Sequence, residues 1–118
     1  MDDETKIRAM VESYFCALHL GDVVQLATLF AMDCVLKTPG QRRTCQRWLA
    51  DVASRPVPQQ IGHPWQYRII WVELAGDQAM AKVNCPLPHG QFTDYLGLLK
   101  EEGEWKIVNK MYALTTGF

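Results

Sequence analysis

The spacing of apolar residues changes once along this chain, near residue 64, and that change constrains the fold more than any other feature. Before it, apolar residues recur every three to four positions, as on one face of a helix. After it, they recur every second position, as in strands. Helices followed by strands predict an α+β domain with the helices packed on one sheet face. The 118 residues are enough for one domain, 1–118, with its own core.

Three helices are predicted in the first half, over residues 4–20, from Asp22 onward and over residues 45–54. Gly21 is a natural C-terminal stop for the first helix, and Asp22 and Thr44 are natural N-caps for the other two. The side chains expected on the buried helix faces are Ile7, Met10, Val11, Tyr14, Ala17, Leu18, Val23, Leu26, Ala27, Phe30, Trp48, Leu49 and Val52.

Strands dominate the rest of the chain. A short strand over residues 34–37 is expected before the turn Pro39-Gly40. Four longer strands follow, over residues 65–74, 78–85, 91–100 and 104–115. Because only short turns separate these four, they are expected to pair antiparallel.

The predicted sheet is apolar on both faces. In the strand over residues 91–100, Leu96 and Leu98 alternate with Tyr95 and Leu99. An antiparallel sheet with one wet face would instead alternate between apolar and polar side chains. The helices can cover only one face, so we expect a homodimer formed through the outer face of the sheet.

Charge and composition exclude several classes of protein. Twelve Lys and Arg residues against thirteen Asp and Glu give a net charge of −1, which leaves no basic field for nucleic acid. No apolar run reaches the length of about 20 residues needed to cross a membrane. The acidic start, Asp2-Asp3-Glu4, is unlike a signal peptide, so a cytoplasmic location is expected.

The four cysteines are Cys16, Cys34, Cys45 and Cys85, and none forms a Cys-x-x-Cys pair. Their spacing predicts buried, reduced thiols rather than disulfides or structural zinc. The histidines also lack the spacing of a helical metal site, and no glycine-rich phosphate loop is present. We therefore expect neither a metal nor a cofactor.

The order of helix, short helix, strand, helix and four long strands resembles the nuclear-transport-factor-two-like superfamily. The matching stretches are Val11-Glu12-Ser13-Tyr14-Phe15, Gly21-Asp22, Leu29-Phe30-Ala31-Met32-Asp33-Cys34, Phe92-Thr93-Asp94-Tyr95-Leu96 and Gly103-Glu104-Trp105-Lys106-Ile107-Val108-Asn109-Lys110. The resemblance spans nearly the whole chain and is nearest to small bacterial proteins labelled putative lumazine-binding or polyketide-cyclase-like (SnoaL-like). It implies a cone in which three helices pack on a curved, mainly antiparallel sheet around an apolar pocket.

Ketosteroid isomerases share this element order and build an oxyanion hole from a tyrosine and a protonated aspartate. Laid along this chain, the resemblance puts these two on Tyr14 and Asp94, and puts the general base on Thr38. A threonine hydroxyl cannot take a proton from carbon at neutral pH, so the donor pair is retained and the base is lost. Both residues also have a structural interpretation, Tyr14 as a core residue and Asp94 as a carboxylate bonded to neighbouring groups.

Other candidates come from the position of each residue in the expected elements. Asn109 and Met111 lie on the alternation that the resemblance points inward, whereas Lys106 and Lys110 are expected on the interface or surface. Trp48 is either the roof of the pocket or a plain core residue.

Loop and helix-start residues complete the candidates. The loop that carries His89 is expected at the mouth of the cone, whereas His19 and His63 are expected on the surface or in loops. The three arginines Arg42, Arg43 and Arg47 are either a solvated helix start or the rim of an anion-binding pocket.

The sequence therefore predicts a protein that binds a small apolar or aromatic molecule in a cone pocket. The expected lining is Tyr14, Trp48, Asp94, Asn109 and Met111. The alternative is a small isomerase, dehydratase or cyclase in which Tyr14 and Asp94 are the candidate catalytic residues. The environment of Asp94 distinguishes the alternatives: a water-poor pocket favours the enzyme, whereas an ion pair with an arginine indicates a structural carboxylate.

Overall fold

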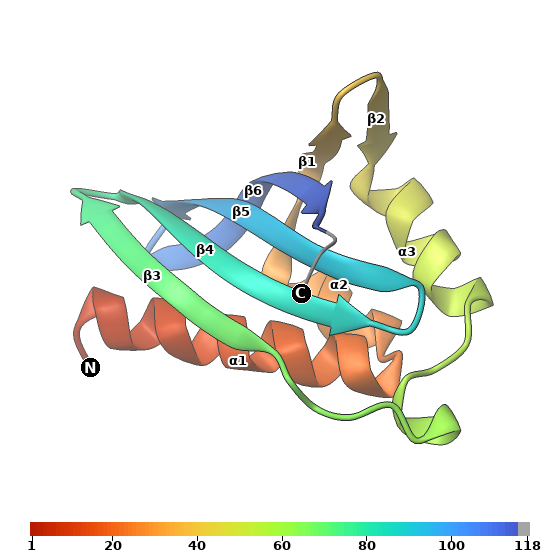
Figure 1. The fold of residues 1–118 in the computed structure, drawn as a ribbon. Helices are drawn as coiled ribbons and strands as arrows, with labels where there is room; N and C mark the ends of the chain where they lie inside the picture. Colours follow the sequence, from red (N-terminus) through yellow and green to blue (C-terminus); the bar gives the residue numbers. More distant parts are fainter. Residues whose placement is uncertain (116–118) are drawn as a thin grey trace.

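The computed structural model describes residues 1–115, in which three helices lie against one face of a six-stranded sheet (Figure 1). The helices are α1 (Asp3–Leu20), α2 (Val23–Leu29) and α3 (Cys45–Ser54), with a 3₁₀ turn, η1, over Gln59–Ile61. The strands are β1 (Phe30–Thr38), β2 (Gln41–Thr44), β3 (Arg68–Ala75), β4 (Gln78–Leu87), β5 (Gly90–Glu101) and β6 (Glu104–Leu114). The predicted α+β class is confirmed.

The sheet has the strand order β2-β1-β6-β5-β4-β3. The last four strands form an antiparallel meander, as their short turns predict, and β1 pairs parallel with β6. The parallel pair brings the first half of the chain beside its end. It places α3, which follows β2, over the same sheet face as α1 (Figure 1).

The helix ends follow the capping residues of the sequence. The carboxylate of Asp22 accepts a hydrogen bond from the backbone N–H of Gln25 at 3.0 Å, and the Thr44 hydroxyl accepts one from Arg47 at 3.0 Å. Gly21 ends α1 with a φ of 65°, a left-handed conformation that glycine adopts without a steric cost. The predicted starts of α2 and α3 are confirmed.

The core fills the space between the helices and the inner face of the sheet. Alternate residues of β4 and β5, such as Val83, Leu96 and Leu98, point toward α1 and are buried. From α1 they meet Val11 and Tyr14, which lie on the predicted face of that helix. The two periods of the sequence therefore meet in one core.

Several predicted boundaries and one cysteine are wrong. The strand predicted over residues 34–37 is β1, which begins at Phe30, and β2 was not predicted from its polar sequence. The strand predicted from residue 65 is β3, which begins only at Arg68. Three cysteines are buried free thiols as predicted, but Cys16 is exposed, because it lies on the solvent side of α1.

In the part of the chain that the structure describes, no helix combines the length and the apolar character needed to cross a membrane. The outer face of the sheet carries partly exposed apolar side chains, among them Ile70, Met80 and Met111. A groove of about 370 Å³ on this face is lined by Tyr95, Met111 and neighbouring residues of β1 and β6.

Candidate functional site

A cavity of about 250 Å³ lies between α3, the end of α1 and the inner face of the sheet. Its lining residues are Leu18, Gln41, Arg43, Trp48, Arg55, Leu87, His89, Phe92, Asp94, Lys110 and Tyr112. Some of these side chains are apolar or aromatic, and others are charged. A concave space that combines apolar walls with convergent polar groups is typical of a ligand site.

A buried polar cluster stands at the back of the cavity. The hydroxyl of Tyr14 donates a hydrogen bond to Oδ2 of Asp94 at 2.9 Å, and Nζ of Lys110 lies 3.8 Å from the same oxygen. The exposed fractions of Tyr14, Asp94 and Lys110 are 0%, 1% and 7%. A charge buried this deeply requires a partner, and Asp94 and Lys110 provide that partner for each other.

The sequence resemblance placed Tyr14 and Asp94 in one pocket, and the structure does bring them together. Their arrangement differs from an oxyanion hole, because Tyr14 donates to Asp94 instead of donating beside it to a third oxygen. Asp94 lines the cavity, whereas Tyr14 lies behind it and is not among the lining residues. Burial, followed by the Asp94 charge, raises the pKa of Tyr14 well above its usual range, so the phenol stays protonated.

A bulge in β6 decides which residues of that strand face the cavity. Leu98 of β5 pairs with Ile107 and Gly97 pairs with Asn109, so Val108 has no partner across the ladder. Beyond this extra residue the alternation is reversed. Lys110 and Tyr112 point inward, next to Asp94 and Leu96, with which they share the ladder.

The expectations for Asn109, Met111 and Lys110 are therefore corrected. Met111 is 42% exposed and lines the groove on the outer face, beside Tyr95. Asn109 pairs with Gly97 on that same face and does not line the cavity. Lys110, expected on the interface or surface, is buried in the cavity. Strict alternation from Ile107 gives the wrong face because the bulge shifts it by one residue.

Trp48 covers the ammonium group of Lys110. Nζ lies 4.3 Å from the centroid of the indole ring, and the ring of Tyr14 is 5.4 Å from the same atom. Cation–π contacts of this kind partly replace the water that burial removes. Burial still lowers the pKa of Lys110, with the Asp94 charge acting in the opposite direction. Trp48 was predicted as a pocket roof or a core residue, and it is both buried and part of the lining.

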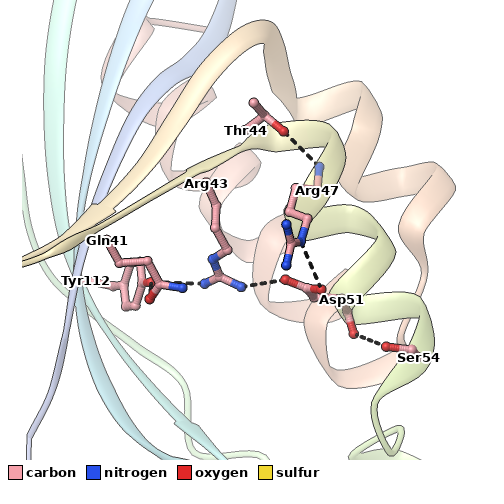
Figure 2. A network of polar contacts seen from close by, with 7 residues as sticks. All are labelled: Gln41, Arg43, Thr44, Arg47, Asp51, Ser54 and Tyr112. Atoms are coloured by element: carbon pink, nitrogen blue, oxygen red, sulfur yellow. Dashed lines mark hydrogen bonds and ion pairs between the residues drawn. The ribbon is translucent and has the colours of Figure 1, made fainter.

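Two arginine side chains, those of Arg43 and Arg55, also line the cavity. Nη1 of Arg43 donates a hydrogen bond to Asp51 at 2.9 Å, and Nη2 donates one to the hydroxyl of Tyr112 at 3.1 Å (Figure 2). That hydroxyl in turn donates to Oε1 of Gln41 at 3.2 Å. This chain of contacts ties β2 to α3 and to β6. Arg43, which lies on β2, is thereby held at the cavity by contacts with α3 and β6.

Only one of the three arginines singled out in the sequence reaches the cavity. Arg42 binds the backbone carbonyls of Thr38 and Gln41 and borders the outer groove. Arg47 lies 3.9 Å from Asp51, and its side chain is 74% exposed. The hypothesis of an anion-binding rim therefore applies to Arg43, and the solvated interpretation applies to Arg47.

Three polar atoms of the cavity residues are buried and have no hydrogen-bond partner among the residues that the structure describes. They are Oδ1 of Asp94, Nε of Arg43 and Nη2 of Arg55. Orphaned buried polar atoms are rare in folded proteins, because each costs about 1–3 kcal/mol. All three belong to side chains that line one cavity, so a molecule inside it could serve as their partner.

The histidines do not form one cluster with the polar groups of the cavity, and only His89 lines it. His89 lines the cavity beside Phe92, with 5.1 Å between ring centroids, and burial lowers its pKa, as do the Arg55, Lys110 and Arg43 charges. His19 is not on the surface as expected, since it is buried and bonded to the Tyr67 hydroxyl. Across residues 1–115, no group of three His, Cys, Asp or Glu side chains is arranged to hold a metal ion.

Sequence reasoning missed Arg55, Tyr112 and Gln41 altogether. Thr38, where the resemblance puts the general base, borders the outer groove and not the cavity. One signal for Arg55 was available in the sequence. Pro56 disfavours a helical backbone at the residue before it, so the helix ends just before Arg55 and the chain changes direction there.

The comparisons with known proteins agree with this architecture. The family described as putative lumazine-binding matches residues 2–113. No curated protein matches the chain.

Solved structures match along almost the full length. An NTF2-like protein of unknown function from Silicibacter pomeroyi is 26% identical, with 98% of this chain and 100% of that chain covered and a TM-score of 0.76. One from Methylobacillus flagellatus is 23% identical, covering 98% and 94%, with a TM-score of 0.83. A Nostoc punctiforme domain of unknown function with a cystatin-like fold is 15% identical, covering 98% and 78%, with a TM-score of 0.75.

The match over residues 2–113 covers nearly every element of the fold, from the start of α1 to the last residues of β6. The chain belongs to the putative lumazine-binding family of the NTF2-like superfamily.

Proposed function

We propose that this protein binds a small molecule in the cavity between α3 and the inner face of the sheet. The observation that carries the proposal is the set of three buried polar atoms, on Arg43, Arg55 and Asp94, that have no partner within residues 1–115. A ligand that forms hydrogen bonds with these atoms would offset the free energy that each unpaired group costs.

The size and the lining of the cavity limit which molecules can bind there. A volume of about 250 Å³ is below the usual range of drug-sized sites and suits a molecule of one or two rings. Trp48 and Phe92 provide flat aromatic walls, and Leu18 and Leu87 provide aliphatic ones. The family description names lumazine, a flat two-ring heterocycle, which makes it a reasonable first probe.

A calorimetric titration with lumazine and a panel of one-ring and two-ring aromatic compounds tests the proposal. At least one compound should bind the unmodified protein and raise its Tm, because a ligand that binds only the folded state stabilises it. The variant Leu87→Trp, which fills the cavity, should abolish that binding. The control is Val24→Trp, at an exposed position of α2, and this variant should bind the compound as the unmodified protein does. Binding that survives Leu87→Trp would place the ligand elsewhere, and a panel without binders would contradict the proposal.

Acid–base catalysis of the isomerase, dehydratase or cyclase type is the second candidate. The observation that favours it is Lys110, a buried lysine with a lowered pKa beside Asp94. In its neutral form, which the lowered pKa favours, such a lysine can act as a base where Thr38 cannot. Incubating a bound carbonyl compound with the protein in deuterated water separates the two. Exchange at the carbon next to the carbonyl indicates chemistry, and unchanged ligand indicates binding alone.

A further inference from the structure

The charges that face the cavity do not balance. Three lining residues are cationic, Arg43, Arg55 and Lys110, and one is anionic, Asp94. Asp94 lies beside Lys110, and Arg43 is paired with Asp51 on α3. Within residues 1–115, no carboxylate forms an ion pair with Arg55. The guanidinium of Arg55 is therefore the unbalanced charge of the cavity.

The cationic groups are close enough to affect one another. Burial is the main cause that lowers the pKa of Arg55, and the Arg43 charge lowers it further. Burial likewise lowers the pKa of Lys110, and both arginines add to that effect. Fixed positive charges in a space with few counter-charges create a positive potential, which favours an anion and disfavours a cation.

The two arginines lie at the boundary between the cavity and a second hollow. Arg43, Arg55 and His89 line the cavity and also line a neighbouring depression of about 410 Å³. These three side chains mark the boundary between the two hollows, which we call the mouth of the cavity, whereas Asp94 and Lys110 line the cavity alone. The site is therefore asymmetric, with two arginines at the mouth and the ion pair of Asp94 and Lys110 at the back.

The three buried polar atoms without partners show the same asymmetry between the mouth and the back of the cavity. Nε of Arg43 and Nη2 of Arg55 are donors that lack acceptors, whereas Oδ1 of Asp94 is an acceptor that lacks a donor. Asp94 is only 1% exposed, so bulk water has little access to its carboxylate. A molecule that meets all three atoms needs an anionic acceptor at one end and a hydroxyl or amino donor at the other.

We propose that the ligand is a small aromatic carboxylic acid with a ring hydroxyl or amino group. Its carboxylate accepts hydrogen bonds from Arg43 and Arg55 at the mouth. Its ring lies among Trp48, Phe92 and the leucines, and its donor group faces Asp94. This inference rests on the proposed ligand-binding function and adds the chemical class of the ligand. A cavity of about 250 Å³ is too small for a nucleotide, which separates this class from phosphorylated nucleosides.

Matched probes test the polarity of the site directly. The probes are 3- and 4-hydroxybenzoate, the corresponding hydroxybenzamides, which lack the charge, and benzoate, which lacks the donor. Calorimetry at neutral pH should show at least one hydroxybenzoate binding about tenfold to a hundredfold more tightly than its amide, because the amide loses a charge-assisted contact with arginine. Benzoate should bind about tenfold more weakly than that hydroxybenzoate, because Oδ1 of Asp94 then lacks a donor.

Variants of Arg55 test whether this residue causes the preference for the acid over the amide. Arg55→Gln should reduce the preference for the acid over its amide to less than about threefold while still binding the amide, because the charge is lost and the ring pocket is kept. Arg55→Lys should restore part of the preference. Arg47→Gln is the matched control, since Arg47 is exposed on the preceding helix and should retain the full preference. Circular dichroism and Tm establish that each variant is folded.

The outcomes separate the two proposals. Equal binding of acid and amide by the unmodified protein, or an unchanged preference in folded Arg55→Gln, overturns the inference about the anion and leaves ligand binding intact. Benzoate equal to the hydroxybenzoates overturns the role given to Asp94. If no probe binds, nor any compound of the earlier aromatic panel, ligand binding and the ligand class fail together.

Discussion

At the scale of single residues, one lysine sets the character of the site. Lys110 has a carboxylate 3.8 Å away, an indole ring 4.3 Å away and almost no exposure to solvent. Removing one member of such a pair leaves the other charge buried and alone, whereas replacing both by neutral groups removes the problem. Asp94 and Lys110 should therefore be strongly coupled energetically.

The coupling can be measured with a double-mutant cycle. Asp94→Asn should lower the free energy of unfolding by about 3 kcal/mol, because Lys110 is left without its counter-charge. Adding Lys110→Met should recover most of this loss. Urea denaturation measures Asp94→Asn, Lys110→Met and the double variant. Asp33→Asn, at an exposed position of β1, should change stability by less than about 0.5 kcal/mol. A double variant whose loss equals the sum of the single losses would show that the two residues do not interact.

At the scale of elements, the end of α1 is joined to the segment before β3 by a buried histidine. Nδ1 of His19 lies 2.9 Å from the Tyr67 hydroxyl, and the ring of Tyr67 stacks on Phe15 at 5.4 Å. Burial, with a smaller contribution from the His63 charge, lowers the pKa of His19 below its ordinary value of 6.5. The folded protein therefore holds this imidazole in its neutral form more strongly than the unfolded chain does.

Stability should consequently fall as the medium becomes acidic. Below about pH 6.5 the unfolded chain binds a proton at His19 that the folded protein resists, so protonation favours unfolding. The Tm should decrease from about pH 7 to about pH 5, and the decrease should be smaller in His19→Gln, which keeps a polar partner for Tyr67. Thermal melts across this pH range provide the comparison. An equal decrease in both proteins would assign the pH dependence to other groups.

The elements themselves were largely predictable from the sequence. The caps at Asp22 and Thr44 act through hydrogen bonds within three residues, so the sequence alone is sufficient to locate them. β2 has the sequence Gln-Arg-Arg-Thr and no apolar alternation, and it is a strand only because β1 lies beside it. Local patterns predict local structure, and pairing between distant segments needs the assembled sheet.

At the scale of the whole molecule, the outer face of the sheet carries exposed apolar side chains that no helix of the described chain covers. Ile70, Met80 and Met111 are each at least 37% exposed there, and a groove of about 370 Å³ lies beside Met111. We propose that a second copy of the chain covers this face, as the apolar alternation on both faces of the sheet predicts.

Sedimentation at micromolar concentration tests the dimer. The unmodified protein should sediment at about twice 13.5 kDa. Met111→Glu should shift it toward the monomer mass, because a carboxylate in the apolar contact is left without a partner. Val24→Glu, at an apolar position of α2 that is 75% exposed, is the control and should remain dimeric. A monomer in the unmodified protein, or a stable dimer in Met111→Glu, would contradict a contact through this face.

The sequence by itself determined the class of fold, the helix caps, the antiparallel meander and the meeting of Tyr14 with Asp94. These follow from hydrophobic period, from short-range hydrogen bonding and from a family pattern that spans the chain. Only the tertiary structure decided which residues of β6 face the cavity, because the bulge at Val108 reverses the alternation that a strict period of two would impose. It also decided that Arg43 and Arg55 share a cavity with Lys110, since these residues come from a strand edge, a helix end and a distant strand. The period of a strand is a local property, whereas its register and the charges that surround it are properties of the packed chain.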